Sequence, residues 1–198
     1  MNLFNGLHWR IPVDDNHVFL TFDDGPHPEC TPIILDILAK YYAKATFFCL
    51  GENVEKYPEH YSAIKKAGHA IGSHAYTHIS GWETDNHTYF YNVNKGANVV
   101  ENNMFRPPYG RMKKGQMKFL LQHYDIYMWD LVSGDFDPKV SADKCYKNVI
   151  NNYKPGSIIL FHDNINSISK LQECLPNILD YFNNKGFKMS IISSELQS

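Results

Sequence analysis

Short runs of β-forming residues alternate along the chain with segments of helical periodicity, and this alternation constrains the fold more than any other feature. The candidate strands are residues 17–22, 45–50, 69–74, 104–107, 125–129, 157–161 and 187–192. Between them, apolar residues recur at intervals of three and four, which is typical of amphipathic helices. These helical segments include residues 31–43, 57–68, 113–124 and 168–182. The alternation predicts an α/β fold with a parallel sheet, either open or closed into a barrel.

The composition predicts one globular domain spanning residues 1–198. Hydrophobic residues make up 43% of the chain, enough for one substantial core. The formal charge is −2 and the lysines are scattered, so no basic patch suited to nucleic acid is expected. Unbroken apolar runs such as residues 47–50 and 158–161 fall far short of the roughly 20 residues that span a bilayer, so no transmembrane helix is expected.

The N-terminal residues, MNLFNGLHWRIPVDD, contain neither a basic segment nor an apolar stretch of roughly 7 to 15 residues. We therefore expect no signal peptide and a cytoplasmic location. No CxxC pair occurs among the widely spaced cysteines, Cys30, Cys49, Cys145 and Cys174. Free thiols are typical of a reducing compartment, which agrees with this expectation.

Residue types that carry out catalysis come at or just after the ends of the candidate strands. Asp23 and Asp24 follow the first strand, His74 ends the third, Arg106 lies late in the fourth, Asp130 and Asp135 follow the fifth, and His162 follows the sixth. In parallel β/α architectures, functional sites are assembled at the C-terminal ends of the strands. These residues are therefore expected to converge in space although they lie far apart in the sequence.

Asp23 and Asp24 stand side by side in TFDDGPHP, where Gly25 and Pro26 favour a turn. Adjacent carboxylates repel each other, and a divalent cation on one of them relieves the repulsion while the other stays free for proton transfer. The alternative interpretation is a solvated turn, because Asp, Gly and Pro are common turn residues.

His74 and His78 stand four residues apart, which places both imidazoles on one face of a helical turn within reach of one metal ion. The chain has ten histidines, so ordinary surface or core histidines are the alternative for this pair taken alone. With Asp24 the set becomes two histidines and one carboxylate, leaving a position open for water. That pattern is typical of catalytic metal sites.

Two further segments carry candidate catalytic groups. In RPPYG, residues 106–110, Arg106 would keep Asp23 ionised while a backbone N–H of the stiff loop stabilises an oxyanion. A stiff turn with a surface arginine is the alternative.

His162 directly follows the apolar run SIILF and is suited to protonating an amine leaving group. Taken alone, a histidine that caps the strand through a backbone hydrogen bond is the simpler interpretation.

Together these motifs resemble those of the polysaccharide deacetylase family, the NodB-homology group of carbohydrate esterases, over about residues 17–192. TFDDGP resembles the family's first motif, which implies that Asp23 is the general base and Asp24 a metal ligand. The second motif, His-(Ser/Thr)-x-x-His, is matched at His74 and His78, which the resemblance implies are the other two ligands.

The third and fifth motifs follow in the family's order. RPPYG resembles the third, which implies that Arg106 braces Asp23 and that the Tyr109 N–H helps to form the oxyanion hole. Leu-x-His is matched at Leu160 and His162, which implies that Leu160 lines the pocket for the acetyl methyl group and that His162 is the general acid. The family's fold, a distorted (β/α) barrel with fewer than eight strands, agrees with the roughly seven parallel strands predicted above.

Three positions depart from the family's motifs. Ala75 stands where the second motif has a hydroxyl residue, so a hydrogen bond that braces the loop is expected to be missing. The fourth motif, Asp-x-x-Asp-Trp, is matched only in part, because Val132 and Phe136 replace an acid and a tryptophan. Asp135 is left to orient Arg106 or His162, and Phe136 is a candidate surface for the sugar ring.

The motifs predict an enzyme that uses a divalent metal to hydrolyse the acetamide of an N-acetylated sugar, such as a chitooligosaccharide, peptidoglycan or a related N-acetylglucosamine substrate. Zinc is the first candidate for the metal, with cobalt and nickel as alternatives. Two other functions stay open. One is a metal-dependent hydrolase of a non-sugar amide, since the motifs describe the chemistry better than the groove. The other, suggested by Ala75, Val132 and Phe136, is a carbohydrate-binding protein with impaired catalysis.

Overall fold

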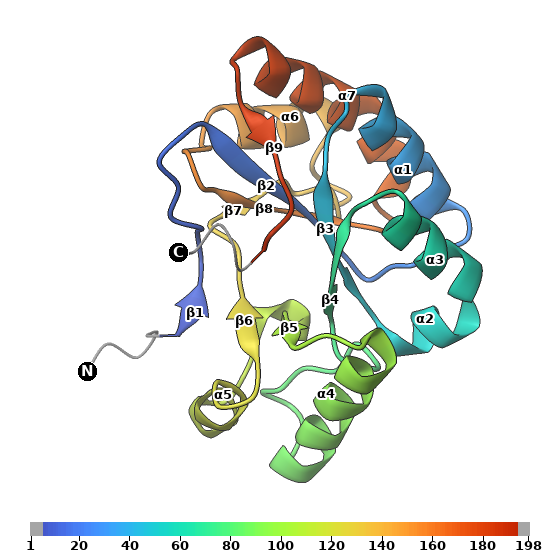
Figure 1. Cartoon of the computed structure of the whole chain (residues 1–198), viewed down its shortest axis with the longest axis vertical. Coiled ribbons are helices and arrows are strands. Elements are labelled where there is room, and N and C mark those ends of the chain that lie inside the picture. The colour runs from blue at the N-terminus through green and yellow to red at the C-terminus, as the bar shows by residue number, and fades with distance from the viewer. Residues whose placement is uncertain (1–5, 194–198) are drawn as a thin grey trace.

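The sheet of the computed structural model, which describes residues 6–193, is parallel and curls into a half-barrel (Figure 1). Its strands follow the order β1 (Leu7–His8), β6 (Asp125–Tyr127), β5 (Met104–Phe105), β4 (Ala70–Ser73), β3 (Ala45–Cys49), β2 (His17–Asp23), β8 (Ile158–His162) and β7 (Leu131–Val132), while β9 (Lys188–Met189) pairs with β2. Strand β2 lies between β3 and β8 and is buried along its whole length, because its side chains pack into apolar clusters on both faces of the sheet.

All seven predicted strands are present, most of them shorter than expected, and the predicted α/β barrel-type fold is confirmed. Residues 6–193 contain nine strands in total rather than about seven. The two additional strands, β1 and β7, have two residues each, which is too short for an alternating pattern to be recognised.

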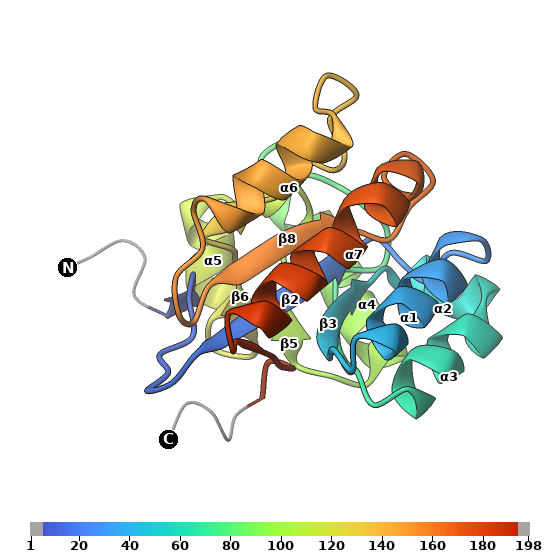
Figure 2. The ribbon, with the colours of Figure 1, turned by 90° about the horizontal axis from the view of Figure 1, so that it is seen from above.

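Helices cover the outer face of the sheet. They are α1 (Cys30–Lys40), α2 (Gly51–Lys56), α3 (Pro58–Lys66), α4 (Asn86–Val100), α5 (Lys114–Leu120), α6 (Ala142–Ile150) and α7 (Ile168–Asn184), with one 3-10 turn, η1 (Pro108–Gly110). The four helical segments named from the sequence become α1, α3, α5 and α7. Figure 2 shows α6, α7 and α1 side by side over β8, β2 and β3.

Alternate residues of a strand point to opposite faces of the sheet, and this alternation separates packing from chemistry. The even-numbered residues 18–22 of β2 belong to the core between the sheet and the helices. On the opposite, inward face, β2 runs from the apolar Phe19 to Asp23 at its C-terminal end. Strand β8 repeats this order from Ile158 to His162. The inside of the half-barrel is therefore apolar at one end and carries reactive groups at the other.

Asp130 is the one strand-end residue whose predicted position is wrong. Its carboxylate accepts hydrogen bonds from the Ile158 N–H (2.9 Å) and the Ser157 hydroxyl (3.0 Å), and it pairs with Arg10 (2.9 Å). These contacts place it at the N-terminal ends of β7 and β8. The physical reason is that β7 begins at Leu131, so Asp130 precedes a strand that the sequence pattern did not reveal.

The apolar residues gather in three buried clusters.

Within residues 6–193, every helix is too short or too polar to cross a bilayer. The four cysteines are all buried and free, and Cys49 belongs to the core between sheet and helices, as expected from its apolar surroundings in the sequence.

Candidate active site

The remaining strand-end residues meet at one end of the half-barrel. Asp23 and His162 are register partners at the ends of β2 and β8. His74 and Arg106 each come directly after a strand, and the Arg106 N–H donates to the carbonyl of Ser73 (2.9 Å), which ties β4 to the loop after β5. The convergence expected from a parallel sheet is thus present, with Asp130 as the exception.

Arg106 is fully buried and fixes Asp23. Its Nη1 donates to Asp23 Oδ1 (2.7 Å) and to the Thr21 hydroxyl (2.7 Å), while Nε and Nη2 donate to the carbonyls of Tyr127 (3.1 Å) and Met128 (2.9 Å). Burial raises the pKa of the Asp23 carboxyl, and the guanidinium acts in the opposite direction. These contacts exclude the interpretation of Arg106 as a surface residue. The other carboxylate oxygen, Asp23 Oδ2, lies 3.8 Å from His74 Nε2.

Asp24, His74 and His78 form a cluster in which one ligand atom from each lies within 4.8 Å of the others. Asp24 Oδ1 is 3.7 Å from His74 Nε2 and 3.5 Å from His78 Nε2. The same oxygen is buried and has no hydrogen-bond partner. An unpaired buried carboxylate oxygen is costly, and a cation between it and the two imidazoles removes that cost. The three residues therefore fit a divalent metal with nitrogen and oxygen ligands.

The orientation of His74 suits a metal ligand. Its Nδ1–H donates to the backbone carbonyl of Arg106 (2.8 Å), and because a carbonyl only accepts, Nε2 is left without a proton and faces Asp24. Burial lowers the pKa of His74 to about 3, so the imidazole is neutral at ordinary pH.

His162 has the opposite character, because its partner is a carboxylate. Its Nδ1–H donates to Asp135 Oδ1 (2.9 Å), and its backbone N–H donates to Asp135 Oδ2 (2.7 Å). Burial lowers the pKa of His162, but the hydrogen bond and charge of Asp135 and the charges of Asp23 and Asp24 outweigh it and raise the pKa to about 9. Of the two roles left open for Asp135, the contacts select orientation of His162 rather than of Arg106.

The predicted substrate contacts surround this centre. Leu160 is buried on the same face of β8 as His162. Tyr109 has a left-handed backbone (φ 59°), and its exposed ring lies 4.3 Å from the ring of His78. The Phe136 ring, 48% exposed, stands edge-on to the His162 ring with 5.1 Å between centroids.

Comparison with known proteins decides the family. The sequence model described as polysaccharide deacetylase matches residues 10–123. The chain belongs to the polysaccharide deacetylase family.

Two curated members of this family illustrate its range. A peptidoglycan-N-acetylglucosamine deacetylase of Bacillus cereus is 35% identical over 195 residues, covering 94% of this chain and 70% of the relative. A chitooligosaccharide deacetylase of Azorhizobium caulinodans is 30% identical over 164 residues, covering 78% of this chain and 77% of the relative.

Solved structures agree with the family assignment. The crystal structure of a peptidoglycan N-acetylglucosamine deacetylase superposes with a TM-score of 0.89 at 33% identity, covering 97% of this chain and 92% of that one. A pseudoenzyme of the same carbohydrate esterase family from Bacillus anthracis superposes with a TM-score of 0.85 at 25% identity, covering 97% of this chain and 69% of that one. The polysaccharide deacetylase fold is thus shared by active and inactive proteins.

The departure at Ala75 from the polysaccharide deacetylase motif is accompanied by a brace from another element. Asn92 on α4 accepts hydrogen bonds from the Thr77 N–H (3.0 Å) and hydroxyl (2.9 Å) and donates to the Thr77 carbonyl (2.8 Å). These contacts hold the loop between His74 and His78. Sequence reasoning missed Asn92 because no motif marks it and it lies 15 residues after Thr77.

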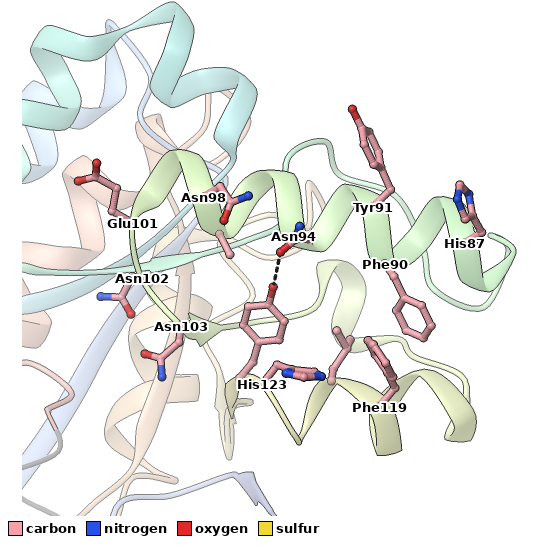
Figure 3. A pocket seen from close by; sticks show the side chains of 13 residues that line it. His87, Phe90, Tyr91, Asn94, Asn98, Glu101, Asn102, Asn103, Phe119 and His123 are labelled. Atoms are coloured by element: carbon pink, nitrogen blue, oxygen red, sulfur yellow. Dashed lines mark hydrogen bonds between the residues drawn. The ribbon is translucent and has the colours of Figure 1, made fainter.

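A groove of about 890 Å³ between α4 and α5 lies apart from this polysaccharide deacetylase site (Figure 3). Its lining includes Phe90, Asn94, Phe119 and His123, and it shares no residue with the metal cluster or the acid–base pairs. The candidate site is therefore located by its reactive side chains and not by this groove.

Proposed function

We propose that the chain is a metal-dependent hydrolase that removes the acetyl group from an N-acetylated sugar. The observation that carries the proposal is the cluster of Asp24, His74 and His78, with Asp23 Oδ2 3.8 Å from His74 Nε2 and His162 beside Asp23 on the neighbouring strand. The names of the polysaccharide deacetylases described above, which specify N-acetylglucosamine in peptidoglycan and chitooligosaccharides, support the choice of substrate.

Asp24, His74 and His78 would hold the metal, with zinc as the first candidate and cobalt or nickel as alternatives. A divalent metal supplies, when bound, a Lewis acid that polarises the acetamide carbonyl and makes water more acidic. The neutral His74 and the unpaired Asp24 oxygen are the groups on which this expectation rests.

The protein's own groups account for the proton transfers. Asp23, held by Arg106 through one oxygen, has its other oxygen free to take a proton from the attacking water. The Tyr109 N–H, in the loop after β5, would stabilise the developing oxyanion. His162, protonated through its contact with Asp135, gives a proton to the departing amine. Acetate and a free amino sugar result.

Exposed aromatic rings beside the centre suit a sugar substrate. Phe136 stands beside His162, and Tyr109 stands beside His78. Arg111 lies over both the Tyr109 ring (5.9 Å) and the Trp82 ring (5.1 Å), and the Trp82 side chain is 58% exposed. Aromatic rings stack on the apolar faces of pyranoses, so the Phe136, Tyr109 and Trp82 rings are the proposed contacts for the sugar.

The test is acetate release from N-acetylglucosamine, chitooligosaccharides and peptidoglycan fragments by protein stripped with a chelator and then reconstituted with zinc or cobalt. We expect added metal to restore acetate release. The relative rates for the three substrates then identify the preferred substrate. A matched set of non-sugar acetamides serves as the control. Release only from these would favour the non-sugar amide hydrolase.

A binding role is the second candidate, because a pseudoenzyme shares the fold. Sugar binding and stoichiometric metal binding without turnover of any substrate would favour it over the hydrolase.

A further inference from the structure

Asn164 reaches the metal cluster from a segment that none of the sequence motifs includes. It lies two residues beyond His162, just after β8, and its Nδ2 donates a hydrogen bond to Asp24 Oδ2 (2.7 Å). The two residues are 140 positions apart in the chain, so the contact exists only because β2 and β8 are neighbours in the sheet.

The orientation of the Asn164 amide is fixed from its other side. Its Oδ1 accepts hydrogen bonds from the N–H groups of Asn166 (3.1 Å) and Ser167 (3.2 Å), just before α7 begins at Ile168. Backbone N–H groups only donate, so the oxygen has to face them. The NH2 group is therefore directed at Asp24.

The two carboxylate oxygens of Asp24 consequently have different surroundings. Oδ2 is occupied by the Asn164 amide, whereas Oδ1 is buried, has no hydrogen-bond partner and faces His74 and His78. The Asp24 backbone is held as well, because Asn53 Nδ2 donates to its carbonyl (2.8 Å). Both ends of the residue are thus tied down, and only one oxygen remains available.

We infer that Asn164 is a positioning residue that presents Asp24 Oδ1, and not Oδ2, to the metal, an inference that rests on the metal site of the proposed function. A group that hydrogen-bonds to a metal ligand without binding the metal itself fixes the orientation of that ligand, so the ligand loses less conformational freedom when the metal binds. The asparagine is suited to this because one amide group both accepts from the backbone turn before α7 and donates to the carboxylate.

The experiment compares zinc affinity in N164S and N166S by isothermal titration calorimetry on metal-free protein. The serine hydroxyl at position 164 still accepts from the backbone before α7 but does not reach Asp24, so the turn keeps its acceptor and the donor to Asp24 is lost. Asn166 has an exposed side chain two positions further on and undergoes the same change, which makes N166S the matched control. We expect the zinc Kd of N164S to rise about 10-fold to 100-fold while N166S stays at the wild-type value.

The melting temperature of the metal-free proteins separates positioning from a purely structural role. N164A loses both the acceptor for the turn before α7 and the donor to Asp24, so its melting temperature falls, yet its zinc Kd is expected to match that of N164S. Weakening that occurs only in N164A and follows its loss of stability would overturn the inference. Wild-type affinity in N164S would overturn it while leaving the metal site intact. Absence of zinc binding by the wild type would overturn both the inference and the metal site of the proposed function.

Discussion

His74 and His162 are both largely buried and both donate through Nδ1, yet the two imidazoles have opposite properties. Their side chains are 2% and 17% exposed, and the hydrogen bonds are 2.8 and 2.9 Å long. The partner of His74 is a neutral backbone carbonyl, and burial lowers its pKa to about 3. The partner of His162 is the Asp135 carboxylate, and its pKa is raised to about 9 in spite of burial.

The hydrogen-bond acceptor thus distinguishes the two histidines, because only the charged acceptor, with the nearby carboxylates, outweighs the effect of burial on the pKa. A neutral acceptor does not offset the effect of burial on the pKa, so the imidazole is uncharged and has a free nitrogen for a metal. An anionic acceptor keeps the imidazole protonated and ready to act as an acid. The two regions, the loop after β4 and the end of β8, use the same residue type for the two halves of the proposed reaction. Four measurements test this division.

The largest effect is expected from H74A. This change removes one proposed metal ligand from the loop after β4 and leaves His162, at the end of β8, unchanged. The two remaining ligands are too few for a catalytic zinc site, so the variant should lose stoichiometric zinc on dialysis and, with it, deacetylation. Elemental analysis and acetate release measure the two losses. A variant that keeps its zinc would show that His74 is not a ligand.

H162Q should reduce turnover while leaving zinc content at the wild-type level. General acid–base groups contribute about 10²-fold to 10⁴-fold, so kcat should fall within that range. Acetate release at saturating substrate, with zinc content determined on the same sample, gives both numbers. If zinc is lost as well, His162 also affects metal binding, and the division of roles between His74 and His162 is wrong.

D135N should move the alkaline limb of the pH–rate profile. In the wild type, His162 is protonated below its pKa of about 9, so the rate should be maintained up to that pH and fall above it. Without the charge of Asp135, burial lowers the pKa and the limb moves to more acidic pH. The rate of the variant should then fall on the order of tenfold for each pH unit beyond the new limb. An unmoved limb would assign it to another group.

The smallest effect concerns the stability of the metal-free protein. Because the folded pKa of His162, about 9, lies above its ordinary value of 6.5, its contribution is fully present below pH 6.5 and is lost as the pH rises through 9. The free energy of unfolding from urea titration should therefore decline more steeply between pH 6.5 and 9 in the wild type than in D135N. Parallel curves would contradict the assigned partnership.

The sequence predicted which residues converge because a parallel sheet gathers the C-terminal ends of its strands, and Asp23, Asp24, His74 and His162 all follow this rule. It failed for Asp130, because β7 is too short to recognise.

The partners of the reactive residues were less predictable. The backbone carbonyl of Arg106, which accepts from His74, has no sequence signature, and Asn92 and Asn164 act through contacts 15 and 140 residues away along the chain. The choice of Asp135 between Arg106 and His162 likewise required distances. Reactive groups are specified locally, whereas the partners that tune them are specified by the fold.

Arg106 contacts both the proposed base and a proposed metal ligand, but with two different parts of the residue. The side chain holds Asp23, and the main-chain carbonyl holds His74. A point mutation replaces the first and cannot delete the second. A substitution at position 106 would therefore disable proton abstraction by Asp23 before it changed the tautomer of His74. Under the proposed function, a lineage with such a substitution would pass through a protein that keeps the metal-binding residues and no longer catalyses deacetylation.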